Sequence, residues 1–260
     1  PGLVVPTAGN AGAALAAYGA AAGMPVKVFA PRTTPRPILD TIEAFGADLV
    51  RIDGHIGDAG KLALAHAAET GFFAISTLRE PYRVEGMKTM GFEMAEQLGW
   101  RVPDVVVYPT GGGEGTVGIW KALAELAAGG WLAGDRVQPR YVVAQAAGCA
   151  PIARAYAAGN DRAEPWVDPV TYAAGLRVPS PLGDRVLLRI LRETQGVAGT
   201  AGEDEMRRWT RRLAEATGID AAPEGGCALV VLRDAVQAGR IAADSEVVVY
   251  NTGSGASYRA

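Results

Sequence analysis

Apolar residues in this chain gather in short β-branched runs that alternate with longer stretches of helical periodicity. Short Val-, Ile- and Leu-rich runs bounded by turn residues are typical of strands buried in a parallel sheet. Such strands need crossover connections, so the alternation predicts an α/β protein. The predicted strands are 3–6, 26–30, 48–52, 72–75, 105–107, 140–145 and 246–250, and the predicted helices are 11–22, 38–45, 56–69, 87–98, a stretch ending at 128, 150–158, 184–193, 204–216 and 228–238.

The most suitable domain boundary falls near residues 89–93, before the strand at 105–107. It divides the chain into a small α/β domain, 1–90, and a larger one, 91–260. The chain begins with proline rather than methionine, inside a predicted strand. We therefore expect part of the small domain to be missing at its N-terminal side.

Composition narrows the function classes. Of the 260 residues 49% are apolar and 20% charged, which supports a sizeable core and argues against disorder. The net charge is −3 and the 25 basic residues are scattered, so neither nucleic acid nor a membrane is an expected partner. The longest apolar stretch, 11–24, is too short to span a bilayer. Cys149 and Cys227 are expected to be buried thiols of a cytoplasmic protein, and no metal site is predicted.

A glycine-rich turn, 110–116, connects the strand at 105–107 to the following helix and contains four glycines and one Glu. Such a turn leaves backbone N–H groups unpaired at the positive end of the helix dipole, an arrangement that binds phosphate. The alternative is a tight turn that binds nothing. Two more turns, 7–12 and 252–255, combine glycine with Thr, Ser or Asn after a strand. Together the three turns predict one cleft for a phosphorylated small molecule.

Five motifs resemble, in the same order, those of threonine synthases, which are pyridoxal phosphate (PLP) enzymes of the tryptophan-synthase-β-like fold, fold type II. The resemblance runs nearly end to end and implies two three-layer αβα domains with mostly parallel sheets and a PLP cleft between them. The larger domain would bind the PLP phosphate. The motifs are Thr7-Ala8-Gly9-Asn10, Tyr82-Arg83-Val84-Glu85-Gly86-Met87-Lys88-Thr89, Pro109-Thr110-Gly111-Gly112-Gly113-Glu114-Gly115, Pro223-Glu224-Gly225 and Asn251-Thr252-Gly253-Ser254-Gly255.

The resemblance also implies roles for individual residues. Asn10 would donate a hydrogen bond to the phenolic oxygen of PLP, and Thr252 would partner the pyridine nitrogen. Arg83 would bind the substrate phosphate, and Thr7 the substrate carboxylate or phosphate. Judged from the residues alone, Asn10 also suits a turn or a helix cap, Thr252 a strand-end turn, and Arg83 an exposed arginine at a helix N-terminus. The cofactor phosphate would be held by Gly111, Gly112, Gly113, Gly115 and Thr116.

Two charged residues near these motifs have other expected roles. Glu114 is unusual at an anion site, and we expect its side chain to point toward the substrate mouth or solvent. Lys88 is expected to pair with Glu85 three residues earlier.

PLP enzymes need a lysine that forms a Schiff base with the cofactor. In this family that lysine lies upstream of the motif that contains Asn10. The four lysines of this chain, Lys27, Lys61, Lys88 and Lys121, all lie elsewhere. We therefore expect an N-terminally truncated chain without the Schiff-base lysine, inactive alone, and we assign no catalytic residue.

Three functions remain open. The first is threonine synthase, which converts O-phospho-L-homoserine and water to L-threonine and phosphate by elimination and replacement in threonine biosynthesis. The second is another enzyme of fold type II, such as a threonine/serine ammonia-lyase or a phosphoserine-using synthase. The third is a non-catalytic ligand-binding protein of the PLP fold. Arg83 favours a small phosphorylated amino acid as substrate, and a homodimer is plausible for the fold.

Overall fold

The chain forms two compact units in this computed structural model, which describes residues 2–259. The first unit contains the stretch up to Glu80 and the stretch from Gly253 onward, and the second contains Pro81–Thr252. The sequence placed the division at residue 90 and the whole C-terminal stretch in the larger domain. The division comes earlier because residues 82–90 belong to a helix that packs along its neighbour in the second unit.

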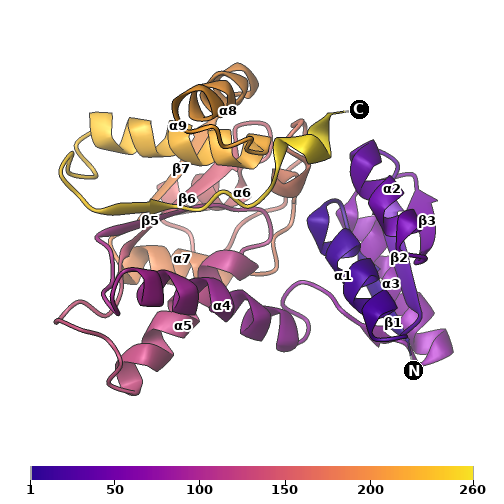
Figure 1. Ribbon diagram of the computed structural model, residues 1–260. Helices are drawn as coiled ribbons and strands as arrows, with labels where there is room; N and C mark the ends of the chain where they lie inside the picture. The colour runs from indigo at the N-terminus through magenta and orange to yellow at the C-terminus, as the bar shows by residue number, and fades with distance from the viewer. Residues whose placement is uncertain (1, 260) are drawn as a thin grey trace. The chain divides into compact units, whose positions relative to one another are not determined.

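A parallel sheet of order β3-β2-β1-β4 forms the centre of the first unit (Figure 1). Val5 and Val28 pack with α1 and α2 on one face, while Val4 and Phe29 pack with α3 on the other, as the alternation of side chains along a strand requires. The elements are β1 (Leu3–Pro6), α1 (Asn10–Ala21), β2 (Val26–Pro31), α2 (Arg36–Ala44), β3 (Asp48–Ile52), α3 (Ile56–Thr70), β4 (Phe73–Ala74) and the 3-10 helix η2 (Gly255–Tyr258), which packs against α2.

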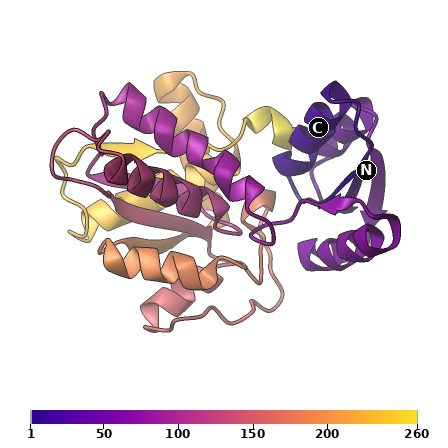
Figure 2. The same cartoon turned by 90° about the horizontal axis from the view of Figure 1, so that it is seen from below.

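The second unit has a parallel sheet of order β7-β6-β5-β8 between two helical layers (Figures 1 and 2). Val106 of β5 faces the core formed with α4, α5, α6 and α7, and Val105 and Val107 face the core formed with α8 and α9. The elements are α4 (Tyr82–Gln97), β5 (Val105–Pro109), α5 (Glu114–Ala128), β6 (Arg140–Ala146), α6 (Pro151–Ala157), η1 (Ala174–Leu176), α7 (Asp184–Glu193), β7 (Val197–Ala201), α8 (Glu203–Thr217), α9 (Pro223–Gln237) and β8 (Val247–Val249).

The predicted α/β class with parallel sheets is confirmed, and most predicted elements are present. Strand β7 was not predicted, because its sequence, Val-Ala-Gly-Thr-Ala, lacks an apolar β-branched run. A methyl group at Gly199 would lie 2.6 Å from a methyl of Val231, so the small residue allows α9 to approach the sheet closely. Helices α4 and α9 begin five residues earlier than predicted, because glycines near their starts obscured the helical pattern.

Helices α4 and α5 pack along each other at glycine contacts. A methyl group at Gly118 would lie 2.5 Å from the Cβ of Met87, and one at Gly91 would lie 2.7 Å from the Cβ of Ala122. Both glycines are therefore required for the short distance between these two helices.

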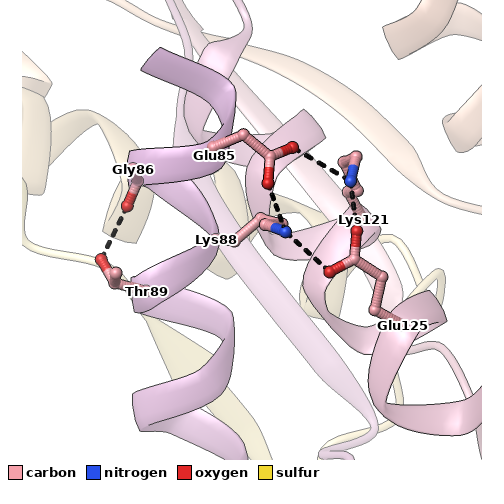
Figure 3. A network of polar contacts seen from close by, with 6 residues as sticks. All are labelled: Glu85, Gly86, Lys88, Thr89, Lys121 and Glu125. Carbon is pink, nitrogen blue, oxygen red and sulfur yellow. Dashed lines mark hydrogen bonds and ion pairs between the residues drawn. The ribbon is translucent and has the colours of Figure 1, made fainter. Parts of the chain in front are cut away.

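Four charged side chains connect the outer edges of α4 and α5 (Figure 3). The predicted pair of Lys88 and Glu85 is confirmed at 2.5 Å, and Lys88 also lies 2.7 Å from Glu125. Lys121 pairs with both carboxylates. Hydrogen bonds that the two lysines donate to Glu125 and Glu85 raise the pKa of both lysines, so both ammonium groups stay protonated.

The described residues also settle the state of the thiols. Cys149 and Cys227 are free and buried, as predicted. Burial raises the pKa of Cys149 to about 11, so it stays a thiol at neutral pH. Within residues 2–259 no helix has both the length and the apolar character needed to cross a bilayer.

The α4–α5 contact generates a stability prediction. Gly118→Ala should lower the free energy of unfolding by about 1–3 kcal/mol, because the added methyl would also lie 2.8 Å from the backbone carbonyl carbon of Met87. Denaturant unfolding followed by circular dichroism measures the change.

Gly86→Ala is the matched control on the exposed face of α4. No heavy atom lies within 4 Å of the added methyl, so the substitution should stabilise the protein by about 0.5–1 kcal/mol. Equal effects of the two substitutions would show that the glycine contacts do not set the helix spacing.

Candidate functional site

The loop between β5 and α5 is the best candidate for an anion site. Strand β5 ends at Pro109, and helix α5 begins at Glu114 after Gly113. Gly113 has φ of 101°, a left-handed conformation that favours glycine, and it gives the helix no side-chain cap. No side chain therefore caps the first N–H groups of α5.

Neighbouring elements press closely on this loop. A methyl group at Gly111 would lie 2.2 Å from the carbonyl oxygen of Gly175, and one at Gly113 would lie 2.6 Å from Leu187. One at Gly115 would lie 2.1 Å from the ring of Tyr108. Packing alone thus accounts for three of the four glycines.

Packing does not account for the hydrogen-bond donors that the loop leaves unused. Within residues 2–259, the N–H groups of Gly111, Gly112, Gly113, Gly115 and Thr116 have no acceptor. The hydroxyl of Thr116 is fully buried and also lacks a partner in this part of the chain. These donors lie at the positive end of α5, an arrangement that suits a phosphate group.

Two buried polar side chains hold the loop in place. Gln145 of β6 donates from Nε2 to the carbonyl oxygen of Thr110 at 3.2 Å, and its Oε1 accepts from the N–H of Ile152 at 2.9 Å. Glu224 of α9 accepts from the N–H of Gly175 at 3.0 Å. Gln145 is not among the site residues predicted from the sequence. A single amide side chain in a largely apolar strand could have indicated a buried polar role.

Glu114 and Arg83 form a buried ion pair beside the loop. Nη2 of Arg83 lies 2.7 Å from Oε2 of Glu114, and their side chains are 17% and 8% exposed. The expectation that Glu114 points toward solvent is therefore wrong, and its direction relative to a substrate mouth stays a prediction. The expectation of a solvent-facing side chain failed because the starts of α4 and α5 are adjacent, which brings the guanidinium to the carboxylate. Burial, and secondly the charge of Glu114, raise the pKa of Tyr108 to about 12, so Tyr108 stays neutral.

Thr7 is used inside its own turn in the first unit. Its hydroxyl donates to the carbonyl oxygen of Gly9 at 2.8 Å and accepts from the N–H groups of Gly9 and Gly12. Because its one proton is taken, this hydroxyl has no proton left to donate to a substrate carboxylate or phosphate. Asn10 is exposed at the first position of α1.

Arg83, the glycine loop and Thr252 all belong to the second unit. Thr252 is exposed and follows β8. Strand β8 pairs with β5 in register, Val107 opposite Val249, so Thr252 follows the same edge of the sheet as the glycine loop.

All four lysines are engaged in ion pairs. Lys27 lies 2.5 Å from Asp48, and Lys61 lies 3.2 Å from Asp58. Lys88 and Lys121 pair with the carboxylates of the α4–α5 edge. A lysine held in an ion pair is not available as a nucleophile, so no catalytic lysine is assigned among the four. Residues 2–259 contain no group of three or more Cys, His, Asp or Glu side chains placed to hold a metal ion.

The sequence of this chain is similar to those of known enzymes. The threonine synthase of Methanosarcina acetivorans is 33% identical over 247 residues, which are 94% of this chain and 60% of that protein. The threonine synthase of Mycobacterium leprae is 31% identical, over 95% of this chain and 66% of that protein. The chain thus spans about 60–66% of the length of these relatives.

The fold is also found among solved structures. Threonine deaminase isoform 2 from Solanum lycopersicum, in its processed form, matches with a TM-score of 0.76 and 19% identity, over 97% of this chain and 69% of that one. The family model described as "Pyridoxal-phosphate dependent enzyme" matches residues 1–253. The chain therefore belongs to the pyridoxal-phosphate-dependent enzymes.

Proposed function

We propose that the protein is a threonine synthase, which converts O-phospho-L-homoserine and water to L-threonine and phosphate. The similarity to threonine synthases along almost the whole chain carries this proposal. The five ordered motifs described above support it. Because the chain spans less than two thirds of these relatives, the proposal concerns the whole protein that contains it.

The glycine loop supplies the phosphate site in this proposal. The N–H groups of Gly111, Gly112, Gly113 and Gly115, with the N–H and hydroxyl of Thr116, bind the PLP phosphate. The unpaired state of these donors and the buried, unpartnered hydroxyl support the assignment. Phosphate oxygens would accept their hydrogen bonds and place negative charge at the positive end of α5.

The remaining assignments rest on the resemblance. Asn10 donates an uncharged hydrogen bond to the phenolic oxygen, and Thr252 pairs with the pyridine nitrogen. PLP supplies an electron sink for bonds at the substrate α-carbon when it is bound. A neutral hydroxyl at Thr252 leaves the pyridine nitrogen mostly unprotonated, which suits elimination and replacement better than transamination.

A second candidate is an ammonia-lyase that acts on an unphosphorylated hydroxy amino acid. One observation favours it. Arg83, the residue expected to bind the substrate phosphate, already has the carboxylate of Glu114 as its counter-ion at 2.7 Å. A guanidinium with a buried internal anion has less charge to offer to a second one.

Product analysis with the full-length protein separates these candidates. A threonine synthase should release phosphate from O-phospho-L-homoserine and form L-threonine. Coupled phosphate detection and amino-acid chromatography measure the two products, with O-phospho-L-serine and L-threonine as alternative substrates. Phosphate release only from O-phospho-L-serine, or ammonia release from L-threonine alone, would contradict the proposal.

Thr116→Val tests the phosphate site without adding bulk. The substitution removes a buried hydroxyl that has no partner among residues 2–259, so the free energy of unfolding should stay the same or rise by about 1 kcal/mol. The affinity for PLP should nevertheless fall about tenfold, because one hydrogen bond to a charged group is lost. Calorimetry and absorbance titration measure the two effects.

Thr34→Val is the matched control. Thr34 has the other buried threonine hydroxyl without a partner among residues 2–259, and it lies in the first unit before α2. Its replacement should have a similar effect on stability and leave PLP affinity unchanged. Equal PLP affinities in the two variants would argue against a phosphate contact at Thr116.

Gly112→Asp tests the loop with charge. A carboxylate beside the unpaired N–H groups would compete with phosphate and repel it, so PLP binding should be lost. Absorbance of the purified full-length variant and its PLP stoichiometry measure the result. Retention of one PLP per chain would refute the phosphate site.

A further inference from the structure

Burying the ion pair of Arg83 and Glu114 costs desolvation free energy. Both charges lose most of their hydration, since the side chains are only 17% and 8% exposed. Arg83 is also the second residue of α4, where the helix dipole disfavours a cation. Packing of α4 on α5 is already provided by Gly91 and Gly118. The charge pair therefore calls for a separate explanation.

Glu114 shares the first turn of α5 with the unpaired donors. It is the first residue of the helix, and Gly115 and Thr116 follow it. A carboxylate in the first helical turn is attracted to that turn's own N–H groups. An unrestrained Glu114 would thus compete, from within the chain, for the donors that an external phosphate needs. In the structure its carboxylate lies against Arg83 instead.

Two neighbouring groups add no net charge to this region. Tyr108, which packs against Gly115, is neutral at physiological pH because its pKa is raised to about 12. The network on the outer edge of α4 and α5 contains two carboxylates and two ammonium groups and is balanced in itself: Glu85, Lys88, Lys121 and Glu125 (Figure 3).

We infer that Arg83 is a positioning residue that holds the Glu114 carboxylate away from the phosphate-binding donors and offsets its charge. The inference rests on the proposed phosphate site and deepens it. Arg83 then acts on the cofactor phosphate through Glu114, whereas the sequence resemblance gives it a direct contact with a substrate phosphate. The two roles make different predictions for cofactor binding. Replacing Arg83 leaves the affinity for a cofactor analogue unchanged if Arg83 contacts only the substrate phosphate, and lowers it if Arg83 positions Glu114.

A double-mutant cycle on the cofactor-free full-length protein separates these roles. The probe is 4′-deoxypyridoxine 5′-phosphate, which carries the phosphate but lacks the aldehyde and so needs no lysine. Arg83→Met should weaken binding about tenfold or more, because it removes the positive charge that lies against the Glu114 carboxylate beside the donors. Glu114→Gln should bind at least as tightly as the parent protein, and the double variant should recover to within about threefold of it. Arg83→Lys, which keeps the charge, should retain most of the affinity.

Unphosphorylated 4′-deoxypyridoxine is the control ligand, because its affinity should change little across the series. A pair that only stabilises the helices would shift the melting temperature without changing the ratio of the two affinities. Titration calorimetry gives the affinities, and thermal unfolding gives the melting temperatures. If Arg83→Met does not fold, Arg83→Gln takes its place in the cycle and is judged by the same results.

Two results would overturn the inference in different ways. If the double variant stays as weak as Arg83→Met, or weaker than Glu114→Gln, Arg83 contacts the ligand itself, and the phosphate site stands without this role. Equal affinity in all variants also removes the role and leaves the site. If the parent protein binds neither ligand, the proposed phosphate site fails together with the inference.

Discussion

The start of α5 is a helix terminus without a cap, and the candidate site depends on this one constraint. Helices ordinarily begin with Ser, Thr, Asp or Asn, whose side chains accept from the first N–H groups. Here Gly113 occupies that position with φ of 101° and offers no side chain. The donors of the loop and the hydroxyl of Thr116 consequently have no acceptor among the described residues. Buried donors in this state are rare in native proteins, and a phosphate would supply the missing acceptors.

The loop keeps its shape because residues distant in sequence hold it from both helical layers. Gln145 joins the carbonyl oxygen of Thr110 to the start of α6. Glu224 of α9 holds η1 through the N–H of Gly175, and the carbonyl oxygen of Gly175 lies against Gly111. Buried polar groups whose partners are all present make a structure rigid and specific. A fixed loop offers its donors without a further loss of entropy when a ligand binds.

Sequence patterns gave the fold class because Val-rich strands such as 105–107 are buried on both faces and therefore read as continuous apolar runs. Strand β7 was not predicted from the sequence. Its residues Gly199 and Ala201 are small, which allows α9 to pack closely, and small residues have little strand propensity. Within the site, the glycine loop was recognisable, since its chemistry is local. The environment of Glu114 could not be predicted from the sequence, because it depends on Arg83 of another helix. No local sequence pattern indicates which helix N-termini are adjacent.

Glycine content alone is weaker evidence for a phosphate site than the sequence pattern indicates. Three of the four glycines are required by contacts with Gly175, Leu187 and Tyr108, so a tight turn that binds nothing would need them as well. Such a turn would not need a buried hydroxyl without a partner, and it would be more stable with a capping side chain. Thr116 and the unpaired N–H groups, rather than the glycines, therefore indicate an anion site. Because these donors must stay available, a carboxylate at position 114 is acceptable only while Arg83 holds it aside.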